Sequence, residues 1–85
     1  MLNAEIEAAY RTYFPIIRAK CMRMLRDPQE SFDVAQETFT RLCESRSDLQ
    51  EPRAVLAWAY RTATRISIDR LRRRKVAGAI FVDVV

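Results

Sequence analysis

Apolar residues recur at helical spacing in three stretches of this 85-residue chain, and this pattern restricts the fold more than any other feature. In the first stretch they stand three or four residues apart, at Ile6, Tyr10, Tyr13, Ile17, Cys21 and Met24. Such spacing places the side chains on one face of an α-helix, which has about 3.6 residues per turn. Pro15 lies inside the stretch and leaves its phase unchanged, so we expect a helix that is kinked near Pro15.

The second stretch predicts a helix over about Pro28–Glu44. Asp27 suits the N-cap position and Pro28 the first helical position, so the pair ends the first helix and begins the second. The apolar stripe of this helix comprises Phe32, Ala35, Phe39 and Leu42. A polar connection, Ser45–Pro52, follows it.

The third stretch predicts a helix from about Arg53 to Lys75 or Val76, with Gly78 as its stop. Its buried stripe is expected to comprise Leu56, Ala59, Ala63 and Ile66. Together the three stripes predict an all-α fold, a compact bundle of three main helices.

Composition agrees with a helical fold and argues against an enzyme. The chain has one Gly, three Pro and no His. All-β folds use more Gly and Pro in their turns, and without His a nucleophile lacks its usual base. Cys21 and Cys43 are expected to be reduced and to behave as small apolar residues. Asp33 and Glu37 stand one turn apart and could bind a divalent ion, but solvated acids are much commoner on helices. We therefore expect no catalytic residue, no cofactor and no metal.

The sequence carries no sign of export or membrane insertion. No apolar run reaches the roughly 18 residues of a membrane span. Residues 1–10 hold two Glu where a signal peptide has Lys or Arg. A cytoplasmic protein is expected, and a monomer.

Charge is distributed unevenly along the chain, whose net charge is +4. Residues 27–51 hold seven acidic and two basic side chains, whereas residues 52–75 hold one acidic and eight basic side chains. This separation suggests two partners of opposite charge, a nucleic acid for the basic segment and a basic protein for the acidic one. Helix faces that pair with one another are the alternative.

The basic segment also carries aromatic residues, a combination that suits nucleic-acid phosphates and base stacking. Cations favour a helix C-terminus, which explains the run Arg72–Lys75 without a ligand. That explanation fails for Arg61 and Arg65, which lie in the middle of the helix. We expect all these cations to neutralise phosphates. Trp58 has two open interpretations, base stacking and packing in the core.

Two motifs and their spacing resemble a known family. Residues 33–39, Asp-Val-Ala-Gln-Glu-Thr-Phe, and residues 57–74, which contain Ala-Trp-Ala-Tyr-Arg and Ile-Asp-Arg-Leu-Arg-Arg-Arg, are similar to the second region of bacterial extracytoplasmic-function (ECF) sigma factors. The resemblance extends over about Tyr10–Lys75. It implies a helical domain that binds RNA polymerase core and that recognises and melts the promoter −10 element during transcription initiation.

The resemblance also implies which residues contact each partner. The acidic helix would dock on the clamp coiled coil of the largest polymerase subunit, through Asp33, Gln36, Glu37 and Arg41. The connection and the third helix would bind the non-template strand of the −10 element. The residues expected there are Arg46, Ser47, Asp48, Gln50, Trp58, Tyr60, Arg61, Arg65, Arg72 and Arg73. An anti-sigma factor is a further partner that the resemblance admits.

The chain departs from the family pattern at several positions. Ser31-Phe32 stands where the family has Ala-Glu, Arg65 where it has Asn, and Ala59 where it has a bulky apolar residue. The family also has a second domain that reads the −35 element. We expect residues 1–78 to form the region 2 domain and the apolar tail 79–85 to begin a linker, in a domain excised from a longer protein, although a strand docked on a partner also fits the tail.

Two other functions remain open from the sequence. A protein-interaction module would bind polymerase or a regulator through the acidic helix and never engage DNA. The stripe of Trp58, Arg61 and Arg65 argues against it, because such a module does not need cations there. The second alternative function is binding to an anionic membrane through a basic amphipathic helix. The Ala-rich apolar face of the third helix argues against this function.

Overall fold

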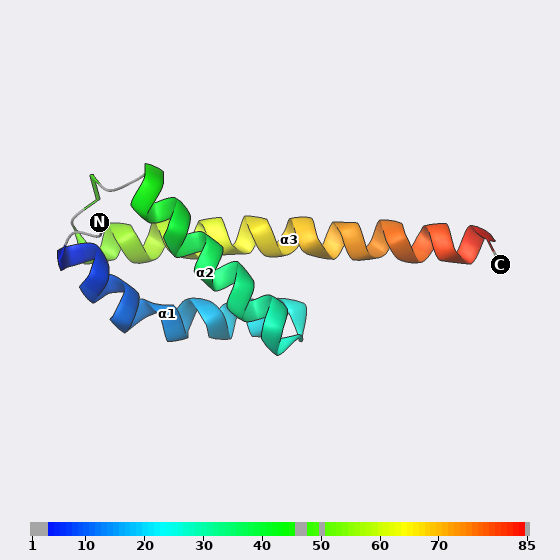
Figure 1. Cartoon of the computed structure of the whole chain (residues 1–85), viewed down its shortest axis with the longest axis horizontal. Helices are drawn as coiled ribbons and strands as arrows, with labels where there is room; N and C mark the ends of the chain where they lie inside the picture. The colour runs from blue at the N-terminus through cyan, green and yellow to red at the C-terminus, as the bar shows by residue number, and fades with distance from the viewer. Residues whose placement is uncertain (1–3, 46–47, 50, 85) are drawn as a thin grey trace.

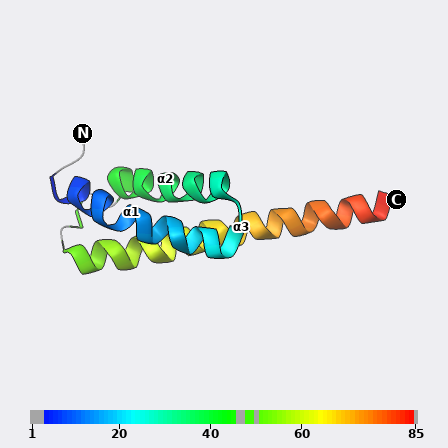
Figure 2. The same cartoon turned by 90° about the horizontal axis from the view of Figure 1, so that it is seen from below.

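The computed structural model describes residues 4–45, 48–49 and 51–84, which form three helices. Helix α1 spans Ala4–Leu25, α2 spans Pro28–Ser45 and α3 spans Pro52–Val84. Helices α1 and α2 pack on the N-terminal half of α3, and the rest of α3 projects beyond them (Figures 1 and 2). The molecule is therefore elongated, 53 × 21 × 20 Å along its principal axes. The predicted all-α bundle of three helices is confirmed.

Helix α1 continues through Pro15, as the unbroken apolar phase predicted. Its N-terminal part runs obliquely to the remainder (Figure 1), which agrees with the expected kink, because Pro lacks the amide hydrogen that a regular helix uses. Helix α1 ends at Leu25, and the next residue, Arg26, has a left-handed φ of 55° and donates its N–H to the Met22 carbonyl at 2.9 Å. Asp27 then caps α2, because its Oδ1 accepts from the Glu30 N–H at 2.9 Å.

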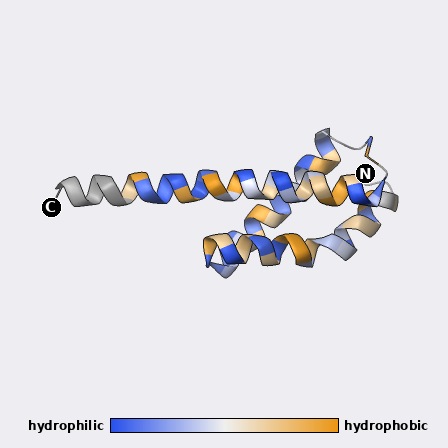
Figure 3. Ribbon diagram, turned by 180° about the vertical axis from the view of Figure 1, so that it is seen from behind, coloured by the Kyte–Doolittle hydropathy of each residue, from blue (hydrophilic) through white to orange (hydrophobic). Residues whose placement is uncertain are grey.

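The core lies where the three helices meet. Its fully buried members include Ile17 and Cys21 of α1, Val34 and Leu42 of α2, and Ala63 of α3. The small residues of α3 allow the other helices to approach its backbone closely. Polar residues prevail on the projecting part of α3 as far as it is coloured (Figure 3). Among the described residues, no helix is long and apolar enough to cross a membrane.

Phe32 does not belong to the core, which corrects the predicted stripe of the second helix. Its side chain is 37% exposed, and Ser31 and Val34 are the buried residues beside it. Ala35, Phe39 and Leu42 are buried as predicted, and Thr38 joins them. The Phe32 ring instead meets the Phe14 ring edge-on, with centroids 5.6 Å apart, and the Arg18 guanidinium lies 5.7 Å from its centre. Phe32 therefore adds contacts between α1 and α2 at the surface of the bundle, outside the core.

The third helix does not stop at Gly78, and the segment that could have been a strand is helical. Helix α3 runs on to Val84. One Gly inside a helix costs only about 1 kcal/mol, which the neighbouring residues of a long helix can offset. The predicted linker role of residues 79–85 stays a prediction.

Candidate functional site

The acidic residues expected to dock on a protein lie along the outer side of α2. Asp33, Gln36 and Arg41 are exposed and Glu37 is half-buried. Gln29 Nε2 donates to Asp33 Oδ1 at 3.1 Å, and Arg41 donates to Glu37 Oε1 at 3.2 Å. Both contacts join residues one turn apart on an open helix surface, where such pairs contribute only tenths of a kcal/mol. A partner could therefore displace them at little cost.

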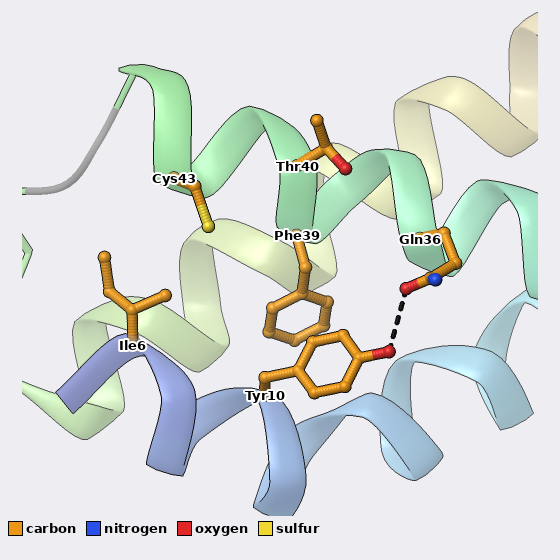
Figure 4. A pocket seen from close by; sticks show the side chains of 6 residues that line it. All are labelled: Ile6, Tyr10, Gln36, Phe39, Thr40 and Cys43. Atoms are coloured by element: carbon orange, nitrogen blue, oxygen red, sulfur yellow. Dashed lines mark hydrogen bonds between the residues drawn. The ribbon is translucent and has the colours of Figure 1, made fainter. Parts of the chain in front are cut away.

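Gln36 has a more specific environment than the acids. A hollow between α1 and α2 begins at its side chain (Figure 4), with a lining of Ile6, Tyr10, Gln36, Phe39, Thr40 and Cys43. The Tyr10 hydroxyl donates to Gln36 Oε1 at 2.8 Å. The motif alone does not reveal this contact, because Tyr10 fits equally well as one member of the apolar stripe of α1.

Basic residues form a ridge along the exposed side of α3. Arg61, Arg65, Arg72 and Arg73 are all exposed there, and their contact with DNA stays a prediction. Arg53 is exposed on the same helix and lines a groove together with Arg61. From the sequence, Arg53 was expected only to mark the start of the third helix. Its spacing of eight residues from Arg61, close to two helical turns, was the signal that could have added it to the ridge.

A groove between the C-terminal end of α2 and the middle of α3 brings several expected residues together. Trp58 is half-buried, so one part of its ring packs on the core and another part lines the groove. Packing against the core is thus observed, and base stacking stays a prediction. The groove is lined by Arg41, Ser45, Trp58, Thr62, Arg65, Ile66 and Asp69. Arg41, which was expected on the polymerase side, thus lies at the same groove as Trp58 and Arg65.

Tyr60 and Arg61 lie on the side of α3 that faces α1. They line a second groove with Ile16, Arg53, Leu56 and Ala57. The Lys20 Nζ atom lies 5.2 Å from the centre of the Tyr60 ring, a cation–π contact. Trp58 and Arg65 thus line one groove and Tyr60 and Arg61 line the other, whereas Arg72 and Arg73 are exposed farther along α3.

Arg74 differs from its neighbours in the basic run. Its guanidinium donates to the Leu25 carbonyl at 2.9 Å and is ion-paired with Glu30, which also pairs with Arg70 at 3.6 Å. Arg74 thus fastens α3 to the corner between α1 and α2. The expectation that the whole run is available for phosphates is wrong for this residue. No local pattern predicts the contact with Glu30, because the two residues are 44 positions apart.

The connection between α2 and α3 is described only in part. Arg46, Ser47 and Gln50 lie outside the described residues. Asp48 is exposed in a turn, and Leu49 packs against the core. The predicted base recognition by this connection stays a prediction.

The two thiols lie in protected positions. Cys21 is fully buried and Cys43 partly buried, and burial raises the pKa of both. The Ser67 hydroxyl opposes the shift in the pKa of Cys21. In the described part of the chain, no group of three or more Cys, Asp or Glu side chains is placed to hold a metal ion.

Comparison of the sequence with known proteins identifies the family. The sequence matches the sigma-70 region 2 family over residues 9–76, so the chain belongs to that family. It is also 40% identical over 55 residues to the ECF RNA polymerase sigma factor SigW of Bacillus subtilis (strain 168). That match covers 65% of this chain but only 29% of the relative. No solved structure gives a significant match. The resemblance to the second region of ECF sigma factors is thereby confirmed.

Proposed function

We propose that this sigma factor domain binds RNA polymerase core through α2, and that it recognises and melts the −10 element by holding the non-template strand along α3. The observation that carries the proposal is the groove between α2 and α3, where Trp58 lies beside Arg65 and Arg41. It combines an aromatic surface with cations, as single-stranded nucleic acid requires.

The polymerase side rests on the charge of α2. Among the described residues, the partners of Asp33 and Glu37 are the exposed Gln29 and Arg41 of the same helix. A basic partner surface offers these carboxylates stronger pairs, which raise the association rate and select the partner. The match to a protein named as an RNA polymerase sigma factor supports polymerase as that partner.

The DNA side rests on what a single strand offers and a duplex does not. The exposed Arg61, Arg65, Arg72 and Arg73 can neutralise phosphates of either form, and this contribution depends on salt but not on sequence. Only an unstacked base can place its face on Trp58, a contact worth about 1–3 kcal/mol per base. Because the domain binds the open strand better, it shifts the equilibrium of the promoter toward melting. Sequence preference is assigned to the connection at residues 46–50.

Binding of labelled oligonucleotides to the chain tests the DNA side. A single-stranded −10 sequence is expected to bind weakly, more tightly than random duplex, and with an affinity that falls as salt rises. Replacement of Arg65 by Ala should weaken this binding and reduce the salt slope. The matched control is Arg23→Ala, because Arg23 is an exposed arginine on α1. Binding of polymerase core with no affinity for any oligonucleotide would favour the protein-interaction module instead.

A further inference from the structure

Tyr10 joins α1 to the middle of the predicted docking face on α2. Its hydroxyl donates to Gln36 Oε1 at 2.8 Å across a sequence separation of 26 (Figure 4). Gln36 is exposed and stands between Asp33 and Glu37 in the sequence, directly before Glu37. The contact therefore involves the one uncharged residue among the four expected to dock, Asp33, Gln36, Glu37 and Arg41.

The Tyr10 ring is held on two sides. Its centroid lies 4.9 Å from that of Phe14 and 5.2 Å from that of Phe39, and the Phe39 ring is nearly perpendicular to it, at 79°. Phe39 is itself 3% exposed. Because aromatic rings packed in this way lose most of their freedom when the protein folds, the hydroxyl is fixed in place before any partner arrives.

The hydrogen bond decides what Gln36 can offer a partner. A glutamine amide has one carbonyl oxygen that accepts and one NH2 group that donates twice. With the oxygen engaged by Tyr10, the NH2 group of the exposed Gln36 side chain is left for a partner. The carboxylates of Asp33 and Glu37 on either side can only accept. The docking face then presents an acceptor, a donor and a second acceptor in order along α2.

We infer that Tyr10 is a positioning residue of the polymerase-docking face, and that the surface bound there carries a hydrogen-bond acceptor between two cations. This inference rests on the proposed function. Tyr10 acts through Gln36: it sets the amide orientation and removes the rotational freedom that a partner would otherwise have to restrict.

Replacement of Tyr10 by Phe tests the inference, because it removes the hydroxyl and keeps the packed ring. The affinity of the whole chain for polymerase core is expected to fall about three- to tenfold, as for one side chain that loses its preorganisation. The melting temperature should stay unchanged, because the lost hydrogen bond is solvent-exposed. Tyr13→Phe is the matched control on the same helix and should change neither quantity.

A second variant separates positioning from simple packing. Gln36→Glu keeps an acceptor for Tyr10 but has no NH2 group, so it should weaken polymerase binding by at least as much. In that background, Tyr10→Phe should cause no further loss, since no amide remains to be oriented. Equal losses from Tyr10→Phe in both backgrounds would overturn the inference.

Nuclear magnetic resonance gives a readout that does not require polymerase. The side-chain NH2 of Gln36 should show restricted motion in the native chain and greater motion in Tyr10→Phe. Unchanged motion would overturn the positioning role. If reversal of charge at Asp33 and Glu37 weakens binding but Tyr10→Phe does not, the docking face stands and the role of Tyr10 is wrong. If none of these changes weakens binding, the docking face itself is wrong, and the inference fails with it.

Discussion

Replacement of Arg74 by Met should destabilise the domain, whereas the same replacement at Arg73 should not. Both residues belong to one basic run on α3. Arg74 donates to the Leu25 carbonyl and pairs with Glu30, whereas Arg73 is exposed and has no ion pair or hydrogen bond with the described part of the chain. Methionine preserves the length and much of the apolar stem of arginine, so the comparison isolates the charged head.

The magnitude follows from the contacts that Arg74 makes. A hydrogen bond from a charged donor contributes about 1.5–3 kcal/mol, and a cation at a helix C-terminus contributes about 0.3–1 kcal/mol. The pair with Glu30 is discounted, because 42% of the Arg74 side chain and 21% of the Glu30 side chain are exposed and Arg70 still pairs with Glu30. Because water can solvate the Leu25 carbonyl once Arg74 is gone, we expect a loss of about 1–2 kcal/mol.

Urea denaturation followed by circular dichroism measures this loss. For a domain of this size, about 1 kcal/mol shifts the melting temperature by roughly 4–8 °C. Arg73→Met should leave the midpoint unchanged but reduce the salt dependence of oligonucleotide binding, since Arg73 is free to contact phosphates. Equal urea midpoints for the two variants would refute the assignment of Arg74 to the corner between α1 and α2.

Four further predictions concern the two interfaces and the core. Reversal of charge at Asp33 or Glu37 should weaken polymerase binding by about 1–3 kcal/mol and leave the melting temperature nearly unchanged; full binding by the double reversal would contradict the docking face. Trp58→Ala should lower both the melting temperature and the affinity for single strands, whereas Trp58→Leu should preserve most of the stability and still lose about 1–3 kcal/mol of stacking. Exchange of residues 46–51 for those of another family member should change which −10 sequence is preferred and keep the salt slope; a change in overall affinity alone would make this segment a structural linker. Burial raises the pKa of Cys21 above its ordinary 9.0, so the unfolded chain loses the thiol proton at a lower pH than the folded chain. The contribution of Cys21 to the free energy of unfolding should therefore be fully present below about pH 9 and decrease as the pH rises further. Urea midpoints measured between pH 7 and 10 should fall less steeply for Cys21→Ala than for the native chain.

The sequence by itself determined the three helices, most of their buried stripes, the cap at Asp27 and the separation of acidic from basic segments. All of these depend on interactions within a few residues: the helical period, the hydrogen bond from Glu30 N–H to Asp27, and the order of charges along the chain. The motifs in residues 33–39 and 57–74 are local as well, and they were sufficient to identify the family. The predicted end of the third helix at Gly78 is wrong, because one Gly is too weak a signal to end a long helix.

Tertiary structure decided which member of each group is available to a partner. Arg73 and Arg74 are neighbours in the sequence, but only Arg74 reaches Leu25 and Glu30. In the sequence, Tyr10 is one apolar position among several. Only the packing of α1 against α2 places its hydroxyl next to Gln36. Such contacts join residues far apart in the chain, so they depend on how the helices cross and rotate against one another. A periodic pattern in one helix contains no information on that geometry. The packing of the three helices around one shared core determines it.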